Sequence, residues 1–312
     1  MKPIKPKALV AGSRVGLVAP SGPAAGGERV DAAREALGEL GYEVVVGMSC
    51  REVHGYLAGQ DASRAADMNA FFADPGIQGI FCMKGGYGTP RILDRLDYAM
   101  IRANPKVFVG YSDITGTHLA LGRECGLVTF HGPMPYSEKG PPWDDASKAR
   151  LLACIGQEGG KGPIANPGDR ALIALSGGRA RGRLVGGNLS LIAATMGTPW
   201  EIDTRDRILF IEDIGERPYR IDRMLTQLRL AGKLAEAAGF IVGDWNDCGP
   251  EEGKGSLTVD EVLEELLTPT GKPILANLAA GHCKPNLCLP LGVEVEIDGD
   301  DPAIVVIEAA TA

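Results

Sequence analysis

The chain has 312 residues, of which 45% are hydrophobic and 23% charged, and its formal net charge is −8. At roughly 150 residues per domain this length indicates about two domains, and the ordinary composition argues against disorder, collagen and coiled coil. The acidic balance argues against a nucleic-acid or anionic-membrane partner, because either needs a basic face.

The seven cysteines form no C-x-x-C motif, and several lie in apolar runs, which is typical of buried thiols in a reducing compartment. The basic N-terminal stretch contains too short an apolar run for a secretion signal. No stretch approaches 18 consecutive apolar residues, so we expect no membrane-spanning helix. These features together predict a cytoplasmic protein.

The first part of the chain alternates between short apolar runs and segments with helical spacing of apolar residues. The pattern predicts strands and helices in the order strand 14–20, helix 28–40, strand 42–46, helix 62–73, strand 77–83, a helix beginning at Thr89-Pro90, strand 106–111 and helix 113–125. Repeated strand–helix units of this length favour a parallel sheet with helices on both faces, which is an α/β fold.

A stretch rich in glycine and proline follows, with Gly-Gly at 159–160, Gly-Pro at 162–163 and Asn-Pro-Gly at 166–168. Such clusters are typical of loops. We therefore expect an N-terminal domain over 1–135, a linker over 136–181 and a C-terminal domain over 182–312. In the last of these the pattern predicts helix 189–196, strand 207–211, helix 220–231 and strands 239–243 and 292–297.

Ser112 stands between the predicted strand 106–111 and the helix expected from Asp113. That turn lies at the carboxyl edge of a parallel sheet, where ligands bind in open α/β proteins. The free N–H groups of a helix start favour a developing oxyanion. The G-x-S-x-G elbow of α/β-hydrolases is not matched, because Ile114 replaces its second glycine. Ser112 is either a nucleophile or simply a helix N-cap.

A serine hydroxyl needs a base to take its proton, and the chain has four histidines. His118 lies six residues beyond the serine in the same predicted helix, too far to reach it. His54 lies in a polar loop and is expected to be exposed. His131, after a short strand, is either a substrate contact or a core histidine, and we favour the core. His282 lies in a Gly-rich, Pro-bounded turn that could aim its ring into a cleft, or it is an ordinary loop histidine.

Glu212 ends the apolar strand Ile208-Leu209-Phe210-Ile211. A carboxylate at a buried strand end needs a partner. An imidazole N–H is a suitable one, since it would fix the tautomer of the ring, and a structural ion pair with Arg217 or Arg220 is the alternative. Asp213 competes for the same role, but side-chain alternation would point it to the other face.

The turn Gly85-Gly86-Tyr87-Gly88 offers backbone N–H groups near the same predicted sheet edge. It matches neither the dinucleotide fingerprint nor the P-loop pattern, so it is a weak nucleotide signal. It is a reasonable second oxyanion donor beside the N–H of Asp113. His282, Cys283 and Cys288 lack the further ligand that a tetrahedral metal site needs. We therefore expect no metal and no cofactor.

Together these segments resemble the LD-carboxypeptidase family of serine peptidases, which includes muropeptide LD-carboxypeptidases and microcin C self-immunity peptidases. The similarity runs over nearly the whole chain. The matching motifs are VGLVAPSGP (15–23), KGGYGTPRIL (84–93), VGYSDIT (109–115), FHGP (130–133), GRLVGGNLSLI (182–192), LFIEDIGERPYRIDRMLTQL (209–228) and GHCKPNLCLPLG (281–292).

The resemblance implies an N-terminal flavodoxin-like domain with a parallel sheet and a smaller C-terminal α/β domain with a mixed sheet. It places a Ser-Glu-His triad at Ser112, Glu212 and His282. One departure is Cys288, where the family leads us to expect a threonine or another small polar residue.

The resemblance also places the oxyanion donors. The oxyanion donors would be backbone N–H groups of Asp113, Gly85 and Gly86. The candidate substrate contacts are Tyr87, His131, Arg217 and Arg220. Structural pairing is an equally good interpretation of the two arginines.

The expected activity is hydrolysis of the amide between an L-centre and the terminal D-alanine of a muropeptide tetrapeptide, in cell-wall recycling. One alternative keeps the fold and the triad but cleaves an aminoacyl-nucleotide amide, as microcin C immunity peptidases do. Such a substrate needs an aromatic surface to stack its base, for which Trp143 and Trp200 are the candidates. A non-catalytic α/β binding protein is the other alternative. A homodimer is left open.

Overall fold

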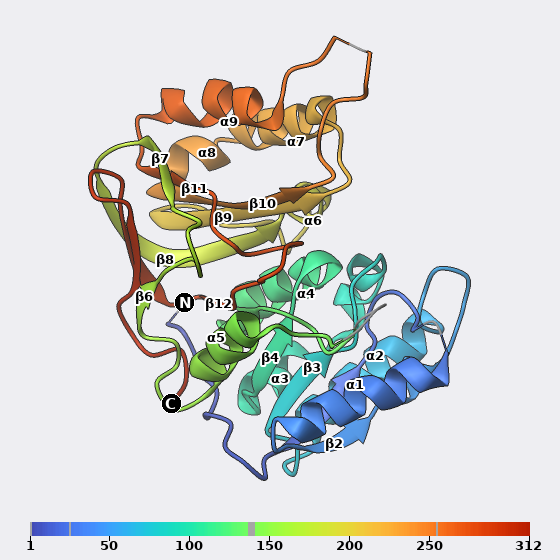
Figure 1. Ribbon diagram of the computed structural model, residues 1–312. Helices are drawn as coiled ribbons and strands as arrows, with labels where there is room; N and C mark the ends of the chain where they lie inside the picture. The colour runs from blue at the N-terminus through green and yellow to red at the C-terminus, as the bar shows by residue number, and fades with distance from the viewer. Residues whose placement is uncertain (1, 25, 137–140, 254) are drawn as a thin grey trace. The chain divides into compact units, whose positions relative to one another are not determined.

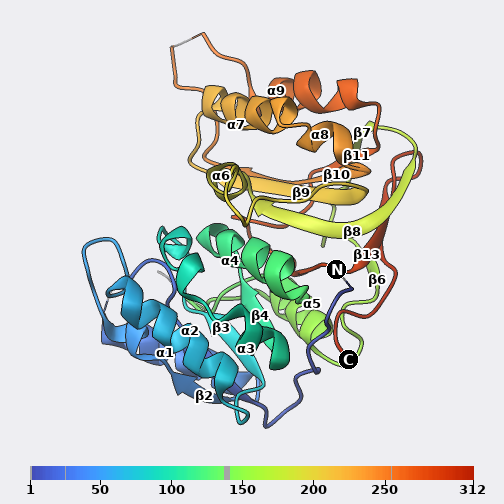
Figure 2. The same ribbon diagram turned by 180° about the vertical axis from the view of Figure 1, so that it is seen from behind.

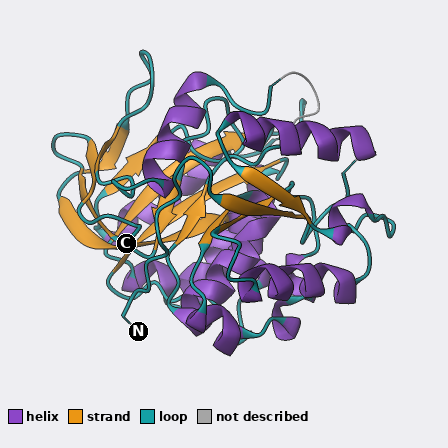
Figure 3. Ribbon diagram, turned by 90° about the horizontal axis from the view of Figure 1, so that it is seen from below, coloured by secondary structure: helices purple, strands orange, loops and turns teal. Residues whose placement is uncertain are grey.

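The computed structural model describes residues 2–24, 26–136, 141–253 and 255–312. It divides into two compact units. The first unit comprises Met1–Gly160, Cys288–Gly292 and Ala309–Ala312, and the second comprises Lys161–Leu287 and Val293–Glu308. In each unit helices flank a β-sheet (Figure 3).

The sheet of the first unit has the strand order β12-β5-β4-β3-β1-β2. Its members are β1 (Arg14–Val18), β2 (Glu43–Val46), β3 (Gly79–Cys82), β4 (Val107–Gly110), β5 (Thr129–His131) and β12 (Leu289–Leu291). Neighbouring strands are parallel except β12, which runs antiparallel to β5. The order of the first five strands is that of flavodoxin-like folds, so the expected fold of this unit is confirmed.

The helices of the first unit cover both faces of this sheet. They are α1 (Gly27–Glu39), α2 (Asp61–Ala73), α3 (Tyr98–Ala103), α4 (Thr115–Ala120) and α5 (Asp145–Ile155). Figures 1 and 2, which view the molecule from opposite sides, show α1 and α2 on opposite faces. Strands β3 and β4 are buried along their whole length, as continuous apolar runs covered on both faces should be.

Two expected helices are less regular than their sequence patterns indicate. Thr89-Pro90 begins only a 3₁₀ turn (Thr89–Arg91), whose cap position is Gly88, and the Thr89 hydroxyl donates to the backbone oxygen of Asp113 at 2.5 Å. The helix expected over 113–125 consists of a 3₁₀ turn (Ser112–Ile114), α4 and a π-helical turn (Leu121–Cys125).

The sheet of the second unit is mixed, as expected, with the order β6-β14-β13-β8-β9-β10-β11-β7. The strands are β6 (Gly162–Ile164), β7 (Ile173–Ser176), β8 (Arg179–Asn188), β9 (Arg207–Ile214), β10 (Gly239–Asn246), β11 (Ile274–Ala276), β13 (Glu294–Asp298) and β14 (Ala303–Val306). The four central strands β8, β9, β10 and β11 are parallel, and the outer pairings are antiparallel.

Among the described residues of the second unit the α-helices are α6 (Leu189–Ala194), α7 (Pro218–Leu230), α8 (Lys233–Glu236) and α9 (Val259–Leu267). Helices α7, α8 and α9 lie together on one face of the sheet, next to β9, β10 and β11 (Figures 1 and 2). Helix α7 is amphipathic, with Ile221, Leu225 and Leu228 buried at helical spacing.

The segment 136–181, expected as a linker, contains regular structure. Helix α5 belongs to the first unit, whereas β6 and β7 belong to the second. Strands β6 and β7 are the two edges of their sheet, and edge strands tolerate the proline and the flanking glycines that resemble a linker in sequence. Across the described residues no helix has the length and apolar character needed to cross a membrane.

Candidate active site

Ser112 occupies a strained turn immediately after β4. Its φ of 65° lies in the left-handed region, which residues other than glycine rarely adopt. Tyr111 occupies the cap position of the following 3₁₀ turn and makes no side-chain cap bond, so the interpretation of Ser112 as a simple N-cap is not supported. Strained, non-glycine turns of this kind cluster at functional sites, and nucleophile elbows are an example.

The glycine turn at 85–88 packs directly against this serine. A β-carbon on Gly85 would lie 2.8 Å from Ser112 Cβ, 2.9 Å from Ser112 Oγ and 3.6 Å from the backbone nitrogen of Asp113. Only a glycine permits such an approach. The structure therefore brings together Gly85, Ser112 and the N–H of Asp113, as the sequence interpretation required of an oxyanion site.

The side chain of Asp113 ties the two turns together. It is fully buried, and its Oδ2 accepts a hydrogen bond from the Thr89 backbone N–H at 2.8 Å. The Thr89 hydroxyl returns a bond to the Asp113 carbonyl. These two bonds hold the end of the 85–88 turn against the start of the serine turn.

In the second unit, Glu212 and His282 form a close pair. Nδ1 of His282 lies 2.6 Å from Oε2 of Glu212, and the carboxylate is fully buried while the imidazole is 11% exposed. Burial raises the pKa of Glu212, and the hydrogen bond from His282 partly offsets this. An ionised carboxylate can only accept, so Nδ1 carries the ring proton and Nε2 is left with a lone pair. Such an imidazole is prepared to act as a base.

Glycines and amides position this pair. A β-carbon on Gly281 would lie 2.6 Å from Oε2 of Glu212, and the φ of Gly281 is +116°. The side-chain amide of Asn246 donates to the His282 carbonyl at 2.8 Å. Oδ1 of Asn286 accepts from the Gly281 N–H at 3.0 Å. The turn that carries the histidine is thus anchored on both sides of it.

Asp213, the competing acid, has another role. It is 2% exposed and accepts hydrogen bonds from the Asn188 side chain at 2.8 Å and from the N–H and hydroxyl of Ser190. It stabilises the start of α6. As alternation along β9 predicted, it is Glu212 and not Asp213 that contacts the histidine.

The alternative ion pair of Glu212 with Arg217 or Arg220 is wrong. Arg217 lies 3.7 Å from Glu251 and Arg220 lies 3.4 Å from Glu216, all with partly exposed side chains. Exposed pairs of this kind contribute little to stability.

The other histidines and Tyr87 lie in different surroundings. His118 is buried, with its ring nitrogens 2.8 Å from the Gly110 carbonyl and 2.9 Å from the Thr129 hydroxyl, and burial lowers its pKa to about 4.

His131 is fully buried with its ring beside that of Tyr111, which fits the core interpretation. His54 is exposed, as expected. Tyr87 is 48% exposed.

All seven cysteines are free thiols, and all but the partly exposed Cys283 are buried, as the sequence suggested. Cys288 packs against a glycine: a β-carbon on Gly132 would lie 2.8 Å from its Sγ. Within the described residues, no group of three or more His, Cys, Asp or Glu side chains is placed to hold a metal ion.

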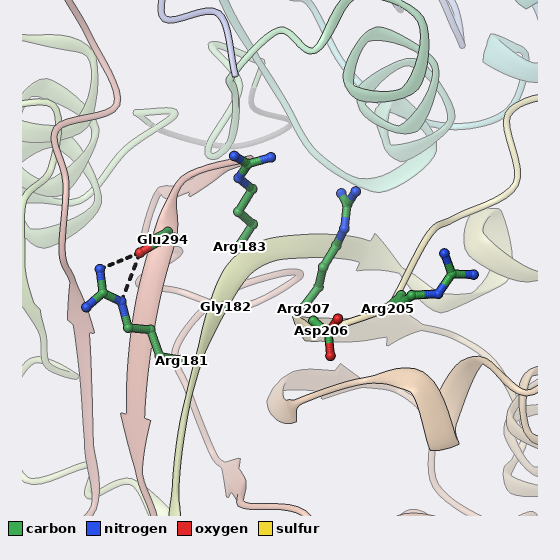
Figure 4. A pocket seen from close by; sticks show the side chains of 7 residues that line it. All are labelled: Arg181, Gly182, Arg183, Arg205, Asp206, Arg207 and Glu294. Atoms are coloured by element: carbon green, nitrogen blue, oxygen red, sulfur yellow. Dashed lines mark hydrogen bonds and ion pairs between the residues drawn. The ribbon is translucent and has the colours of Figure 1, made fainter. Parts of the chain in front are cut away.

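A hollow of about 500 Å³ in the second unit lies away from the Glu212–His282 pair. Four arginines line it, together with Gly182, Asp206 and Glu294 (Figure 4). Arg183, midway along β8, and Arg207, at the start of β9, are register partners on neighbouring strands, and their side chains extend in the same direction (Figure 4). Glu212 pairs with Asn188 five residues further along, or about 16 Å away at 3.3 Å per residue.

Comparison with known proteins places these features in a family. Residues 15–132 match the model of the LD-carboxypeptidase N-terminal domain, and residues 181–297 match that of the LD-carboxypeptidase C-terminal domain. The probable murein peptide carboxypeptidase of Bacillus subtilis is 43% identical over 97% of this chain and 94% of its own length. The chain belongs to the LD-carboxypeptidase family. The relatives that are named carboxypeptidases support a carboxypeptidase role for this chain.

Solved structures support this membership in the LD-carboxypeptidase family. MccF in complex with glutamyl sulfamoyl guanosine has a TM-score of 0.92 and 26% identity, covering 99% of this chain and all of its own. The muramoyltetrapeptide carboxypeptidase of Oxalobacter formigenes has a TM-score of 0.79 and 27% identity, covering 93% of this chain and 97% of its own. The two relatives carry names that point to different substrates.

Proposed function

We propose that this chain is a serine-type LD-carboxypeptidase that removes the terminal D-alanine from a muropeptide tetrapeptide. Ser112 is the nucleophile, His282 its base and Glu212 the acid that orients the imidazole. The observation that carries this proposal is the 2.6 Å contact between His282 Nδ1 and Glu212 Oε2, which leaves Nε2 as the proton acceptor. The strained turn at Ser112 supports it independently.

In this mechanism the hydroxyl of Ser112 attacks the carbonyl carbon of the scissile amide while His282 Nε2 takes its proton. The oxyanion that forms is stabilised by the N–H of Asp113 and an N–H of Gly85 or Gly86. The C–N bond then breaks, and the proton on His282 passes to the amine of the departing D-alanine. Water, deprotonated by the same histidine, hydrolyses the acyl-enzyme and returns the serine.

Substrate contacts form a further part of the proposal. Tyr87 extends from the turn that touches Ser112, and its ring centroid lies 5.8 Å from that of Tyr56, also exposed. Arg217 and Arg220 are partly exposed, and a substrate carboxylate could replace their ion pairs with Glu251 and Glu216 at little cost. His131 is the weakest candidate, because it is fully buried.

The names of two relatives support a muropeptide as the substrate. These are a murein peptide carboxypeptidase and a muramoyltetrapeptide carboxypeptidase. The MccF relatives keep an aminoacyl-nucleotide amide as the rival substrate. Of the two tryptophans considered for stacking a base, Trp143 is only 9% exposed, whereas Trp200 is partly exposed and is the better candidate for that rival. A muropeptide substrate agrees with the cytoplasmic location proposed from the sequence.

The test is mass spectrometry of two purified compounds after incubation with the protein: the tetrapeptide L-Ala-γ-D-Glu-meso-diaminopimelate-D-Ala and glutamyl sulfamoyl adenosine. The proposal predicts loss of D-alanine from the first, and the Ser112→Ala variant as control should leave it intact. Cleavage of the nucleotide alone would replace the muropeptide by the rival substrate. Turnover by the Ser112→Ala variant equal to that of wild type would overturn the assignment of Ser112 as the nucleophile.

A further inference from the structure

Arg64 is a buried cation that the proposed mechanism does not use. It lies on α2 and is 0% exposed, on the same helix face as the buried side chains of Met68 and Phe72. Burying a guanidinium is costly unless its charge is paired and its donors are bonded. Its contacts therefore show what the chain gains from placing it there.

The guanidinium bonds two backbone carbonyls and one carboxylate. Nη1 donates to the carbonyl of Pro20 and, at 2.9 Å, to the carbonyl of Gly88. Nη2 donates to Asp61 at 2.5 Å. A β-carbon on Gly88 would lie 2.6 Å from Nη1, so this glycine is needed for the approach. One planar group thus joins the loop after β1, the turn after β3 and the first turn of α2.

The two loops that Arg64 joins also contact each other, and one of them contacts Ser112. The Gly22 N–H donates to the Gly85 carbonyl at 3.2 Å, and a β-carbon on Gly22 would lie 2.8 Å from that oxygen. Gly85 in turn packs against Ser112. The 85–88 turn is therefore held at two points. Gly22 bonds the Gly85 carbonyl at its start, and Arg64 bonds the Gly88 carbonyl at its end.

We propose that Arg64 is a positioning residue that fixes the 85–88 turn so that its N–H groups face the oxyanion formed at Ser112. This inference rests on the proposed function, because it assigns the 85–88 turn a role in that reaction. Preorganised donors stabilise a developing charge without having to reorient during the reaction. Arg64 acts by holding the backbone of the turn in place through its hydrogen bonds, and it contacts neither the substrate nor the reacting atoms.

An arginine suits this role better than a lysine. Its rigid fork presents several donors at fixed angles, whereas an ammonium is a point charge on a flexible chain. With Arg64→Lys, a single ammonium group would replace the fork, and it could not keep the Asp61 contact and both carbonyl bonds at once. The geometry of the 85–88 turn would relax while the charge remained.

Arg91 offers a matched control. It also binds Asp61, with Nε and Nη2 at 3.0 Å from the carboxylate oxygens, but its side chain is 42% exposed. In the described structure the side-chain hydrogen bonds of Arg91 go to Asp61, and it is its backbone N–H, which a lysine keeps, that donates to the Gly88 carbonyl at 3.2 Å. Arg91→Lys therefore disturbs the same carboxylate and leaves the turn alone.

The experiment compares Arg64→Lys and Arg91→Lys in tetrapeptide turnover and in the rate at which a fluorophosphonate acylates Ser112. The phosphonyl oxygen of that probe reports on the oxyanion site without any peptide. We expect Arg64→Lys to lower kcat and the acylation rate by about 10- to 100-fold, with KM changed less than about twofold, and Arg91→Lys to match wild type. Equal behaviour of the two variants, or a loss in KM alone, would overturn the proposal.

Asp61→Asn serves if Arg64→Lys does not fold. It keeps Arg64 but removes the charge that anchors its guanidinium, so the two carbonyl bonds are no longer held in place, and a loss of acylation rate relative to Arg91→Lys is expected. An acylation rate equal to that of Arg91→Lys would contradict the role of Arg64. Failure of the proposed function would give a different result, because the wild-type protein would then leave the tetrapeptide intact. The acylation rates of the variants relative to wild type would still test the role of Arg64.

Discussion

Gly281 and Glu212 are so close that a β-carbon on the glycine would lie 2.6 Å from the carboxylate oxygen Oε2. That oxygen is the one that pairs with His282, the next residue along the chain. The space that this glycine leaves open is therefore what allows the acid to reach the base.

Gly281→Ala should separate the pair. The new methyl group collides with Glu212, and the φ of +116° adds strain of about 1–3 kcal/mol. We expect a loss of at least about tenfold in kcat. Gly232→Ala is the control, because its φ is +77° but nothing lies within 4 Å of the added carbon. It should lose stability in thermal unfolding and keep its activity; equal losses of activity in both variants would refute the steric explanation.

Replacing Ser112 should remove activity without destabilising the fold. Ser112→Ala keeps the backbone strain at φ 65° and loses only a hydroxyl, so its free energy of unfolding should stay within about 1 kcal/mol of wild type. Ser112→Gly relieves the strain and should be at least as stable as the alanine variant. Chemical denaturation and D-alanine release measure the two properties. Residual turnover above a few per cent in either variant would exclude Ser112 as the nucleophile.

Glu212→Gln should cost activity but not stability. The raised pKa means that the folded protein binds this proton more tightly than the unfolded chain does, so stability is lost as pH rises through the folded pKa, and the loss persists at neutral pH. The neutral amide avoids it. We expect a kcat lower by roughly 100- to 10,000-fold from the wrong tautomer, with an unfolding free energy at neutral pH no lower than that of wild type. A markedly less stable variant would show that the charged pair stabilises the fold.

His118 should make the protein acid-sensitive. Its pKa falls from 6.5 to about 4 on folding, so the unfolded chain binds the proton first and stability is lost as pH falls from about 6.5 towards 4. The full effect is on the order of 3 kcal/mol. His118→Gln, which can keep the bonds to Gly110 and Thr129, should reduce the slope of unfolding free energy against pH in this range. An unchanged slope would assign the sensitivity to other groups.

Much of the fold follows from local pattern. The apolar runs that became β1, β3 and β4, and the serine turn after β4, are visible in the sequence because buried parallel strands are almost wholly apolar. The short edge strands β6 and β7 were not predicted, since glycine and proline at a sheet edge resemble a loop.

Some residues of the candidate site can also be predicted from local sequence pattern, and others cannot. Ser112 and Glu212 stand out locally, but the contact of Glu212 with His282 spans 70 residues and depends on sheet pairing that no local pattern contains. Arg64 was missed altogether. Its signal was available, because it precedes Met68 and Phe72 by four and eight residues, on the buried face of α2. A cation at such a position indicates specific partners.

The proposed LD specificity is tested by kcat/KM on three peptides: the LD tetrapeptide, its counterpart with L-alanine at the terminus, and the pentapeptide ending in D-Ala-D-Ala. A serine held in one backbone conformation approaches the carbonyl from one face, with the oxyanion donors fixed opposite it. Inverting either centre misplaces the reacting atoms, which costs about a hundredfold. We expect the LD tetrapeptide to be preferred by at least that factor. Comparable values on all three would contradict it and indicate a general peptidase.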